Sequence, residues 1–378
     1  MRNLGIEEFR RWNIDNRGKR KDNHESTLRL CSGQAKKLEN TKEERIEGFK
    51  IDDWRLRMGT SEGSQGELTA YRGHTLSGIG MTPILPGLIL GAAVRVIRWL
   101  AGLRTQEVQV DDHRWVYLEG GKGETMLFVH GFGAEKDSWG PFLRPFSRSY
   151  RLIVPDLPGF GESSHIPSAS YDVPTQVKRL HRFVETINLP PFHLVGVSLG
   201  GYISAYYASE YPERVKSLAL MDAAGVESRI PSCAMEIYKR EGEIILLYKT
   251  LKQFDALTRA LFYRPPPMPA LYRKYFAKRG ARNYGFHEKI LQDLEKSGMN
   301  LLEDRLSEIM ARTLILWGEQ DRMVHVSSVE KFEKGIQNSR TVIVKKCGHV
   351  PFFEKRKETV RAYEAFLRTL QGEHPPGR

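Results

Sequence analysis

The sequence predicts an α/β fold in which helices cover both faces of a mostly parallel sheet. From about Glu107 onward, short apolar and β-branched runs alternate with stretches of helical periodicity. This alternation is typical of parallel strands joined by crossover helices. One such run ends at a serine between two glycines, and polar residues follow several others. Because open parallel sheets build their sites at the carboxyl ends of their strands, we expect these residues to meet there.

Eight strands are expected in this core. The first two form a hairpin, and a glycine-rich turn leads from it into the third. A helix over 175–187, with Val177, Leu180 and Val184 on one face, precedes the fifth strand, and a helix over 358–370 closes the core. The strands are expected at 108–110, 114–118, 126–130, 151–154, 192–197, 215–221, 313–317 and 341–344.

The interval 226–310 interrupts this alternation between the sixth and seventh strands. It is longer than a single crossover, has a helical pattern and is rich in Tyr, Phe, Leu and Arg. We interpret it as a helical cap over the strand ends, so that the core consists of 105–225 and 311–378. Its apolar residues, such as Leu247 and Phe254, fit a lipid substrate and equally a cap packed on its own core.

The chemistry is expected to centre on residues 194–201, which read L-V-G-V-S-L-G-G. In a nucleophile elbow, a strand turns sharply into a helix, and the residue at the apex has a strained backbone that exposes its side chain. Gly196 and Gly200 flank Ser198 at the positions where a Cβ would crowd this turn. The pentapeptide alone also fits a plain turn, but the β-branched run before it and the helical pattern after it favour the elbow.

Three further segments follow predicted strands. Residues 130–133 read H-G-F-G and come after the third strand, where a loop can offer a backbone N–H to an oxyanion. Asp321 follows the seventh strand in W-G-E-Q-D, and His349 follows the eighth in C-G-H. The chain order Ser, Asp, His is that of the α/β-hydrolases.

These residues form a consistent catalytic set. A serine hydroxyl is a weak nucleophile, so His349 would accept the proton of Ser198, a general-base contribution of about 10²- to 10⁴-fold in rate. Asp321 would fix the imidazole tautomer and stabilise the imidazolium. The backbone N–H groups of Phe132 and Leu199 would form the oxyanion hole.

Other polar residues have simpler interpretations or compete for these roles. We expect His130 and Gly131 to support the oxyanion loop; no second ligand stands at metal spacing from His130, so neither a metal nor a cofactor is predicted. Asp156 is interpreted as a structural loop residue. Asp222 also ends a strand and is the alternative acid for His349; the usual position of the acid after the seventh strand favours Asp321.

The first 104 residues differ from the rest. Residues 1–73 are polar and charge-mixed and are predicted to be disordered. Whether residues 1–80 belong to the native protein is left open, since Met81 is a second candidate start. Residues 74–104 are hydrophobic and then amphipathic, which predicts a membrane anchor or interfacial helix; the alternative is a helix packed on the enzyme's own surface near the entrance to the active site. The protein is therefore expected to be membrane-associated or cytoplasmic.

The charge of the chain supports a membrane surface more than a nucleic acid. The formal net charge is +12 and the sequence pI is about 9.5. No nucleic-acid-binding motif accompanies this charge, which leaves an anionic membrane or a basic solvated surface. The oligomeric state is not predicted.

Residues from about 107 to 370 resemble the α/β-hydrolases of the lipase and esterase group, most closely the monoacylglycerol-lipase-like branch with an amino-terminal membrane anchor. The resemblance is carried by F-V-H-G-F-G-A-E-K-D-S-W at 128–139, P-F-H-L-V-G-V-S-L-G-G at 191–201 and I-L-W-G-E-Q-D at 315–321, together with 176–179 and 271–274. It implies eight strands with a cap, a Ser198, Asp321, His349 triad and hydrolysis of esters with lipid-like acyl chains. The long polar beginning and the R-P-P-P-M-P at 264–269 depart from that pattern.

The predicted function is a serine carboxylic-ester hydrolase that forms an acyl-enzyme and needs no cofactor. Its substrates would be monoacylglycerol-like or short-to-medium-chain acyl esters, bound as small molecules or lipids. The alternatives are a carbon–carbon bond hydrolase with the same triad and a non-catalytic binding protein of the same fold.

Overall fold

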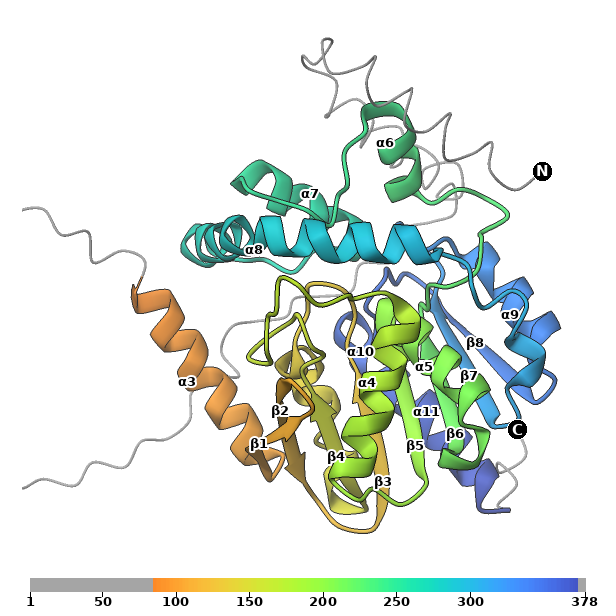
Figure 1. The fold of residues 1–378 in the computed structure, drawn as a ribbon. Helices are drawn as coiled ribbons and strands as arrows, with labels where there is room; N and C mark the ends of the chain where they lie inside the picture. The colour runs from red at the N-terminus through yellow and green to blue at the C-terminus, as the bar shows by residue number, and fades with distance from the viewer. Residues whose placement is uncertain (1–83, 373–378) are drawn as a thin grey trace, which may run out of the picture. The chain divides into compact units, whose positions relative to one another are not determined.

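The computed structural model describes residues 84–372, and an eight-stranded sheet forms their centre (Figure 1). The strand order is β1-β2-β4-β3-β5-β6-β7-β8. The polar segment 1–73, and the part of the predicted anchor before Ile84, lie outside the described residues. The strands are β1 (Leu103–Val110), β2 (His113–Gly120), β3 (Glu124–Val129), β4 (Tyr150–Pro155), β5 (Phe192–Val197), β6 (Val215–Met221), β7 (Arg312–Gly318) and β8 (Ser339–Val344).

The mostly parallel sheet predicted from the sequence is confirmed. β2 pairs antiparallel with β1 and β4, and all other neighbouring strands pair in parallel. The largest difference from expectation is at β1, which begins at Leu103 rather than at residue 108. β1 pairs on one side only and most of its side chains are exposed, so its sequence lacks the apolar run that marks a central strand.

Alternate residues of the central strands enter two separate hydrophobic layers. Leu127 of β3 and Leu194 of β5 belong to the layer under α4 (Val173–Thr186) and α5 (Leu199–Glu210). Phe128 and Val195, one residue further along, belong to the opposite layer. That layer packs against η2 (Lys136–Phe142), α10 (Pro351–Glu354) and α11 (Arg356–Leu370). Burial on both faces explains why these strands are almost continuously apolar.

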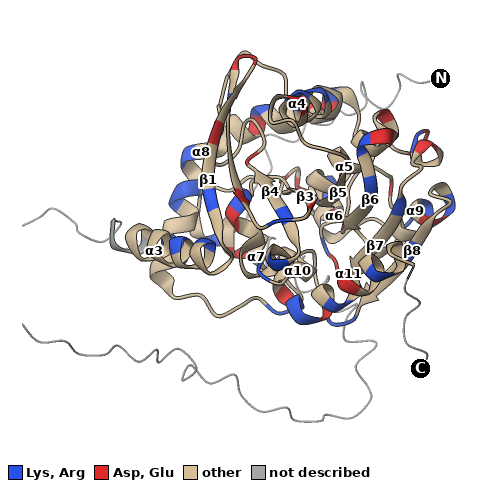
Figure 2. Ribbon diagram, turned by 90° about the horizontal axis from the view of Figure 1, so that it is seen from below, with Lys and Arg blue, Asp and Glu red and all other residues tan. Residues whose placement is uncertain are grey.

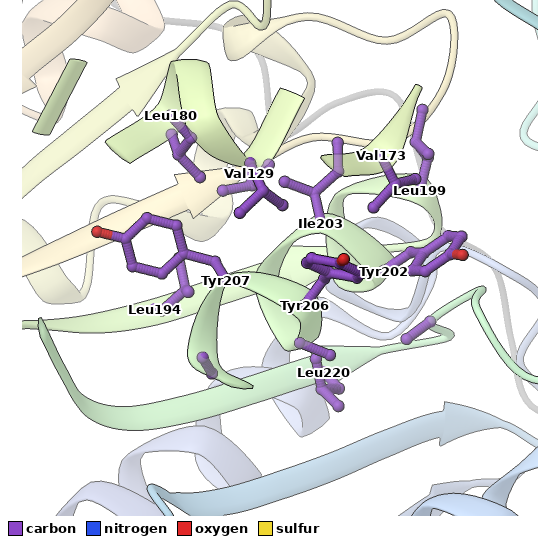
Figure 3. Close-up of a cluster of buried hydrophobic side chains, with 14 of the residues drawn as sticks. Val129, Val173, Leu180, Leu194, Leu199, Tyr202, Ile203, Tyr206, Tyr207 and Leu220 are labelled. Carbon is purple, nitrogen blue, oxygen red and sulfur yellow. The ribbon is translucent and has the colours of Figure 1, made fainter. Parts of the chain in front are cut away.

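The layer around α5 is the one that positions the nucleophile elbow. Figure 3 shows Ile203 of α5 close to Val173 of α4 and Val129 of β3. Ile203, Val173 and Val129 are all fully buried. Because α5 is packed between a helix and the sheet, its first turn is held at a defined height above β5.

Helices also fill the chain between β6 and β7. They are α6 (Cys233–Glu241), α7 (Leu251–Leu261) and α8 (Ala270–Ser297). In Figure 1, α8 lies across the carboxyl ends of the strands, and α6 and α7 lie on its far side. The proline run 264–269 separates α7 from α8, and Pro269 is the N-cap of α8. Gly280 of α8 sits directly against the ring of Tyr248, which leaves no room for a side chain there.

The helix that precedes the core is α3 (Ile84–Leu100), 17 residues long. Within residues 84–372, no helix combines the length and the hydropathy needed to cross a membrane. Arg98 of α3 forms two hydrogen bonds with the Asp137 carboxylate, which ties the helix to the core. The opposite side of α3 leaves apolar side chains exposed, namely Leu88, Ile89, Val96, Trp99 and Leu100.

A buried ion pair fixes the loop that follows β4. Lys136 Nζ lies 2.8 Å from Asp156 Oδ2 and 2.9 Å from Glu162 Oε2. Asp156 also accepts backbone hydrogen bonds from Lys136 and Glu162, and both Lys136 and Asp156 are fully buried. Asp156 therefore holds two loops together, as its interpretation as a structural residue requires.

We expect Lys136→Ala to lower the free energy of unfolding by about 3–5 kcal/mol, because it leaves the buried Asp156 carboxylate without its cation. Lys334→Ala is the control, since the Lys334–Glu330 pair is largely exposed and should change stability by less than about 1 kcal/mol. Urea denaturation of both variants at neutral pH measures the difference. Equal effects would contradict a structural role for the buried pair.

Candidate active site

The nucleophile elbow is built from backbone in close contact. Ser198 lies between β5 and α5 with φ of 55° and ψ of −122°, the strained conformation expected at an elbow. A Cβ added to Gly196 would come within 3.0 Å of the Gly200 carbonyl and the Ser204 hydroxyl. One added to Gly200 would clash equally with the carbonyl oxygens that end β3. The two glycines are thus required by the distance between α5 and its neighbouring strands.

The loop 130–133 runs directly over the serine. An added Cβ on Gly131 would lie 3.2 Å from Ser198 Cβ. His130 is fully buried; its Nδ1 lies 2.8 Å from the Gly131 carbonyl oxygen, and its Nε2 accepts a hydrogen bond from the Leu157 N–H at 3.0 Å. Nδ1 therefore carries the proton, and burial lowers the pKa of His130, which keeps the ring neutral. His130 joins this loop to the one after β4.

The two predicted oxyanion donors belong to the segments that flank the elbow: Leu199 follows Ser198 in the chain, and Phe132 follows Gly131, which lies against Ser198. Leu199 is the first residue of α5, so its N–H has no acceptor within the helix. The N-terminus of α5 also carries a partial positive charge. Phe132 is partly buried, and its ring contacts the ring of Phe160 at a centroid distance of 5.5 Å. The arrangement can stabilise an anion that forms next to Ser198.

The loops after β7 and β8 bring an aspartate and a histidine together. His349 Nδ1 lies 2.7 Å from Asp321 Oδ2, and both residues are 4% exposed. Asp321 Oδ1 accepts hydrogen bonds from the backbone N–H groups of Met323 and Val324. Asp222, the alternative acid, instead accepts a hydrogen bond from the Gly318 N–H. Of the two candidate acids, Asp321 is the one bonded to the imidazole.

The serine itself remains accessible. Ser198 is partly exposed, unlike the residues on either side of it. Ser198 and His349 both lie among the described residues, and their side chains form no direct hydrogen bond in this structure. Such bonds are often long in enzymes without substrate and tighten in the complex.

Among residues 84–372, one group of side chains has the spacing of metal ligands. Within the described part of the chain, ligand atoms of Asp222, Asp321 and His349 lie within 4.8 Å of one another. The imidazole Nδ1 in this set is already bonded to Asp321, and all three residues are buried. Two members of the set, Asp321 and His349, are thus already hydrogen-bonded to each other.

The cap contacts the oxyanion loop through residues that sequence reasoning missed. Arg279 of α8 forms two hydrogen bonds with the carboxylate of Glu135. The His287 ring contacts the rings of Phe132 and Phe160 at 5.4 and 5.6 Å. The alternating charges of α8 predict an exposed helix face. No sequence pattern predicts that Arg279 pairs with Glu135, which lies 144 residues earlier in the chain.

The end of α7 and the segment after it support the loop of His349 in the same way. The His349 N–H donates to the Leu261 carbonyl oxygen at 2.8 Å. Glu354 accepts hydrogen bonds from the backbone N–H groups of Tyr263, Arg264 and Gly348. The loop after β3 and the loop of His349 are therefore both attached to the cap.

Comparison with known proteins agrees with this architecture. A family model described as the alpha/beta hydrolase fold matches residues 124–356. This chain belongs to the alpha/beta hydrolase fold family. The match spans the elbow, the loop 130–133 and the loops of Asp321 and His349, so the family resemblance seen in the sequence is confirmed.

The relatives of this hydrolase include named lipases. Lipase 1 of Psychrobacter immobilis is 31% identical over 306 residues, covering 79% of this chain and 96% of the relative. The monoacylglycerol lipase ABHD6 of Homo sapiens is 27% identical over 296 residues, covering 74% and 88%. The crystal structure of a membrane phospholipase A, described as a bacterial virulence factor, is 40% identical with a TM-score of 0.74, covering 77% and 94%. These similarities support an ester-hydrolysing serine hydrolase.

The cap histidine gives this hydrolase a predictable response to acid. Burial, together with His165 and Arg279, lowers the pKa of His287 from the ordinary value of 6.5 to about 4. Between these two pH values the unfolded chain binds a proton that the folded chain does not, so stability is lost as the pH falls through this window. We expect His287→Gln to lose less stability than the wild type between pH 7 and pH 4, measured by urea denaturation. If His287→Gln loses as much stability as the wild type between pH 7 and pH 4, the lowered pKa of His287 is not the cause of that loss.

Proposed function

We propose that this hydrolase cleaves lipid-like carboxylic esters, of the monoacylglycerol or short-to-medium-chain type, through an acyl-enzyme on Ser198. Two observations carry the proposal, namely a strained serine at the N-terminus of α5 and a buried His349–Asp321 pair on the loops after β7 and β8. Because the carboxyl ends of parallel strands lie at the same edge of the sheet, we infer that these groups act together. The named lipases among the relatives support an acyl ester as the substrate.

The first half of the reaction transfers the acyl group to the enzyme. Ser198 Oγ attacks the ester carbonyl carbon while His349 Nε2 takes the hydroxyl proton. Asp321, bonded to Nδ1, stabilises the imidazolium that forms. As the tetrahedral intermediate collapses, the carbon–oxygen bond to the alcohol breaks and His349 returns the proton to the departing oxygen. The acyl group is then bonded to Ser198 and the alcohol is free.

The second half releases the acid. A water molecule attacks the acyl carbonyl carbon and gives its proton to His349, and the bond to Ser198 Oγ breaks as that proton passes to the serine. In both halves the negative charge on the carbonyl oxygen would be met by the N–H groups of Phe132 and Leu199, each worth about 3–4 kcal/mol in comparable sites. Because these donors are backbone groups, they need no reorganisation during the reaction.

The proposal predicts that Ser198→Ala lowers kcat by about 10⁴-fold or more on esters that the wild type cleaves. We would measure p-nitrophenyl esters of increasing chain length together with a monoacylglycerol, and check both proteins for equal folding. Labelling of the wild type by a fluorophosphonate, absent in the variant, would show an activated serine. A folded wild type that cleaves no ester but accepts the label would move the reaction to another acyl substrate, such as the diketone of a carbon–carbon hydrolase.

We also propose that α3 places this enzyme on a membrane surface. Trp99, the most exposed large hydrophobic residue of the helix at 78%, lies at its C-terminal end. Trp99 lines a cleft together with Lys122, Arg144 and Arg148. Arg144 and Arg148 also line a second cleft with basic residues of α11, whose Lys and Arg are blue in Figure 2. An apolar helix face beside clustered cations is the pattern of a surface that binds anionic lipid.

The membrane proposal predicts that changing both Arg144 and Arg148 to Glu weakens binding to vesicles containing an anionic lipid by about tenfold or more, since each basic residue near such a surface contributes about 1 kcal/mol. Zwitterionic vesicles should show little difference. The control changes Arg340 and Lys345, exposed residues at and after β8, to Glu, which alters the net charge equally. Equal weakening in the control would mean that net charge alone drives binding.

A further inference from the structure

A second aspartate lies beside the proposed acid without a part in the reaction described above. Asp222 follows β6, is fully buried and has a φ of 47°. Its backbone N–H donates to the Leu316 carbonyl oxygen, and its Oδ1 accepts a hydrogen bond from the Gly318 N–H at 2.8 Å. Its other oxygen, Oδ2, is buried and accepts no hydrogen bond from the described residues. A buried carboxylate oxygen without a donor is costly, and this one requires an explanation.

The explanation lies in the distance to Asp321. One oxygen of Asp222, one oxygen of Asp321 and one nitrogen of His349 lie within 4.8 Å of one another. Two carboxylates this close in a buried site do not both ionise, because the second charge would be repelled by the first and stabilised by little solvent. One of the two aspartates must therefore hold a proton.

The hydrogen bonds show which aspartate is ionised. Asp321 accepts from three N–H donors, namely the backbone of Met323 and Val324 and the ring of His349, so its charge is well stabilised. Asp222 accepts from one backbone N–H. The proton therefore belongs on Asp222, where the otherwise unpartnered Oδ2 becomes a donor.

The other groups around Asp222 act in the same direction. Burial and the charge of Asp321 raise the pKa of Asp222 well above its ordinary range, and Glu354 of α10 adds to this. Cys347 lies close to Asp222, and burial raises the pKa of its thiol, which keeps the thiol neutral. The neighbouring loops thus present acidic groups or a neutral thiol to this carboxyl.

We propose that Asp222 is a neutral carboxylic acid that donates a hydrogen bond to the Asp321 carboxylate. It would be a positioning residue, which has no direct part in the reaction described above and acts by holding the acid that orients His349. The inference rests on the proposed function for its kinetic consequences, but the protonation of Asp222 itself does not. No proton is transferred in this role, since the hydrogen bond is present in every step.

Two variants separate a neutral from an ionised Asp222. In Asp222→Asn the amide can still accept from the Gly318 N–H and donate to Asp321, as a protonated carboxyl does. In Asp222→Ala both bonds are lost. We expect Asp222→Ala to lower kcat by about tenfold or more with a smaller change in KM, and Asp222→Asn to recover most of this loss. Asp321→Asn is the reference for loss of the acid itself, expected at about 10⁴-fold.

The pH dependence of kcat/KM gives a second test, because the direction in which its acidic limb moves distinguishes a neutral from an ionised Asp222. A purely structural role would not move this limb. Asp222→Ala removes a neutral donor and leaves the Asp321 charge less stabilised. This favours the protonated imidazole of His349, so the acidic limb of Asp222→Ala moves to higher pH. The limb of Asp222→Asn stays close to that of the wild type. Had Asp222 been ionised, both variants would lose a negative charge and both limbs would move to lower pH. That outcome, or a loss in Asp222→Asn as large as in Asp321→Asn, would overturn the proposal.

A spectroscopic measurement tests the proton directly and needs no activity. The difference infrared spectrum of wild type minus Asp222→Asn at neutral pH should contain the carbonyl stretch of a protonated carboxylic acid. A carboxylate band in its place would overturn the proposal even if Asp222→Ala does not fold. An acid band in a protein that cleaves no ester would retain the neutral Asp222 and reject the proposed function.

Discussion

The close approach of α5 to the strand ends is the constraint on which the rest of the site depends. Gly200 brings the first turn of α5 against the carbonyl oxygens that end β3. A larger residue would push the helix away, and Ser198 at its N-terminus would then move away from the loop 130–133. Gly201 continues this contact on the other side, where an added Cβ would lie 2.6 Å from Ala223 Cβ. The geometry of this site therefore depends on glycines, which have no side chain to hold α5 away from the strands.

A second level of organisation lies above the sheet. The cap is bonded to the oxyanion loop through Arg279 and Glu135 and to the histidine loop through Leu261 and His349. Each reactive loop thus has one support from the core and one from the cap. The strained conformation of Ser198 is stable in this setting because its neighbours on every side are fixed.

Much of this architecture could be predicted from the sequence because it depends on local patterns. Strands buried on both faces give apolar runs, and polar residues such as Asp321 and His349 stand just beyond them. The full length of β1 was missed because an exposed edge strand has no such run. That Asp222 and Asp321 both end strands near His349 was expected from the sequence, but the pairing of Arg279 with Glu135 could not be predicted, since it joins segments that only the folded chain brings together.

The hydrogen bond from the His349 N–H to the Leu261 carbonyl oxygen limits which caps this core can accept. Caps are often regarded as exchangeable lids that tune selectivity while the catalytic core stays constant. Here a core residue relies on a carbonyl contributed by the insertion, and Gly348 leaves space for the passing chain, with an added Cβ 2.6 Å from that same oxygen. A transplanted cap would have to reproduce this backbone path, so the cap and the loop of His349 are structurally coupled in this hydrolase.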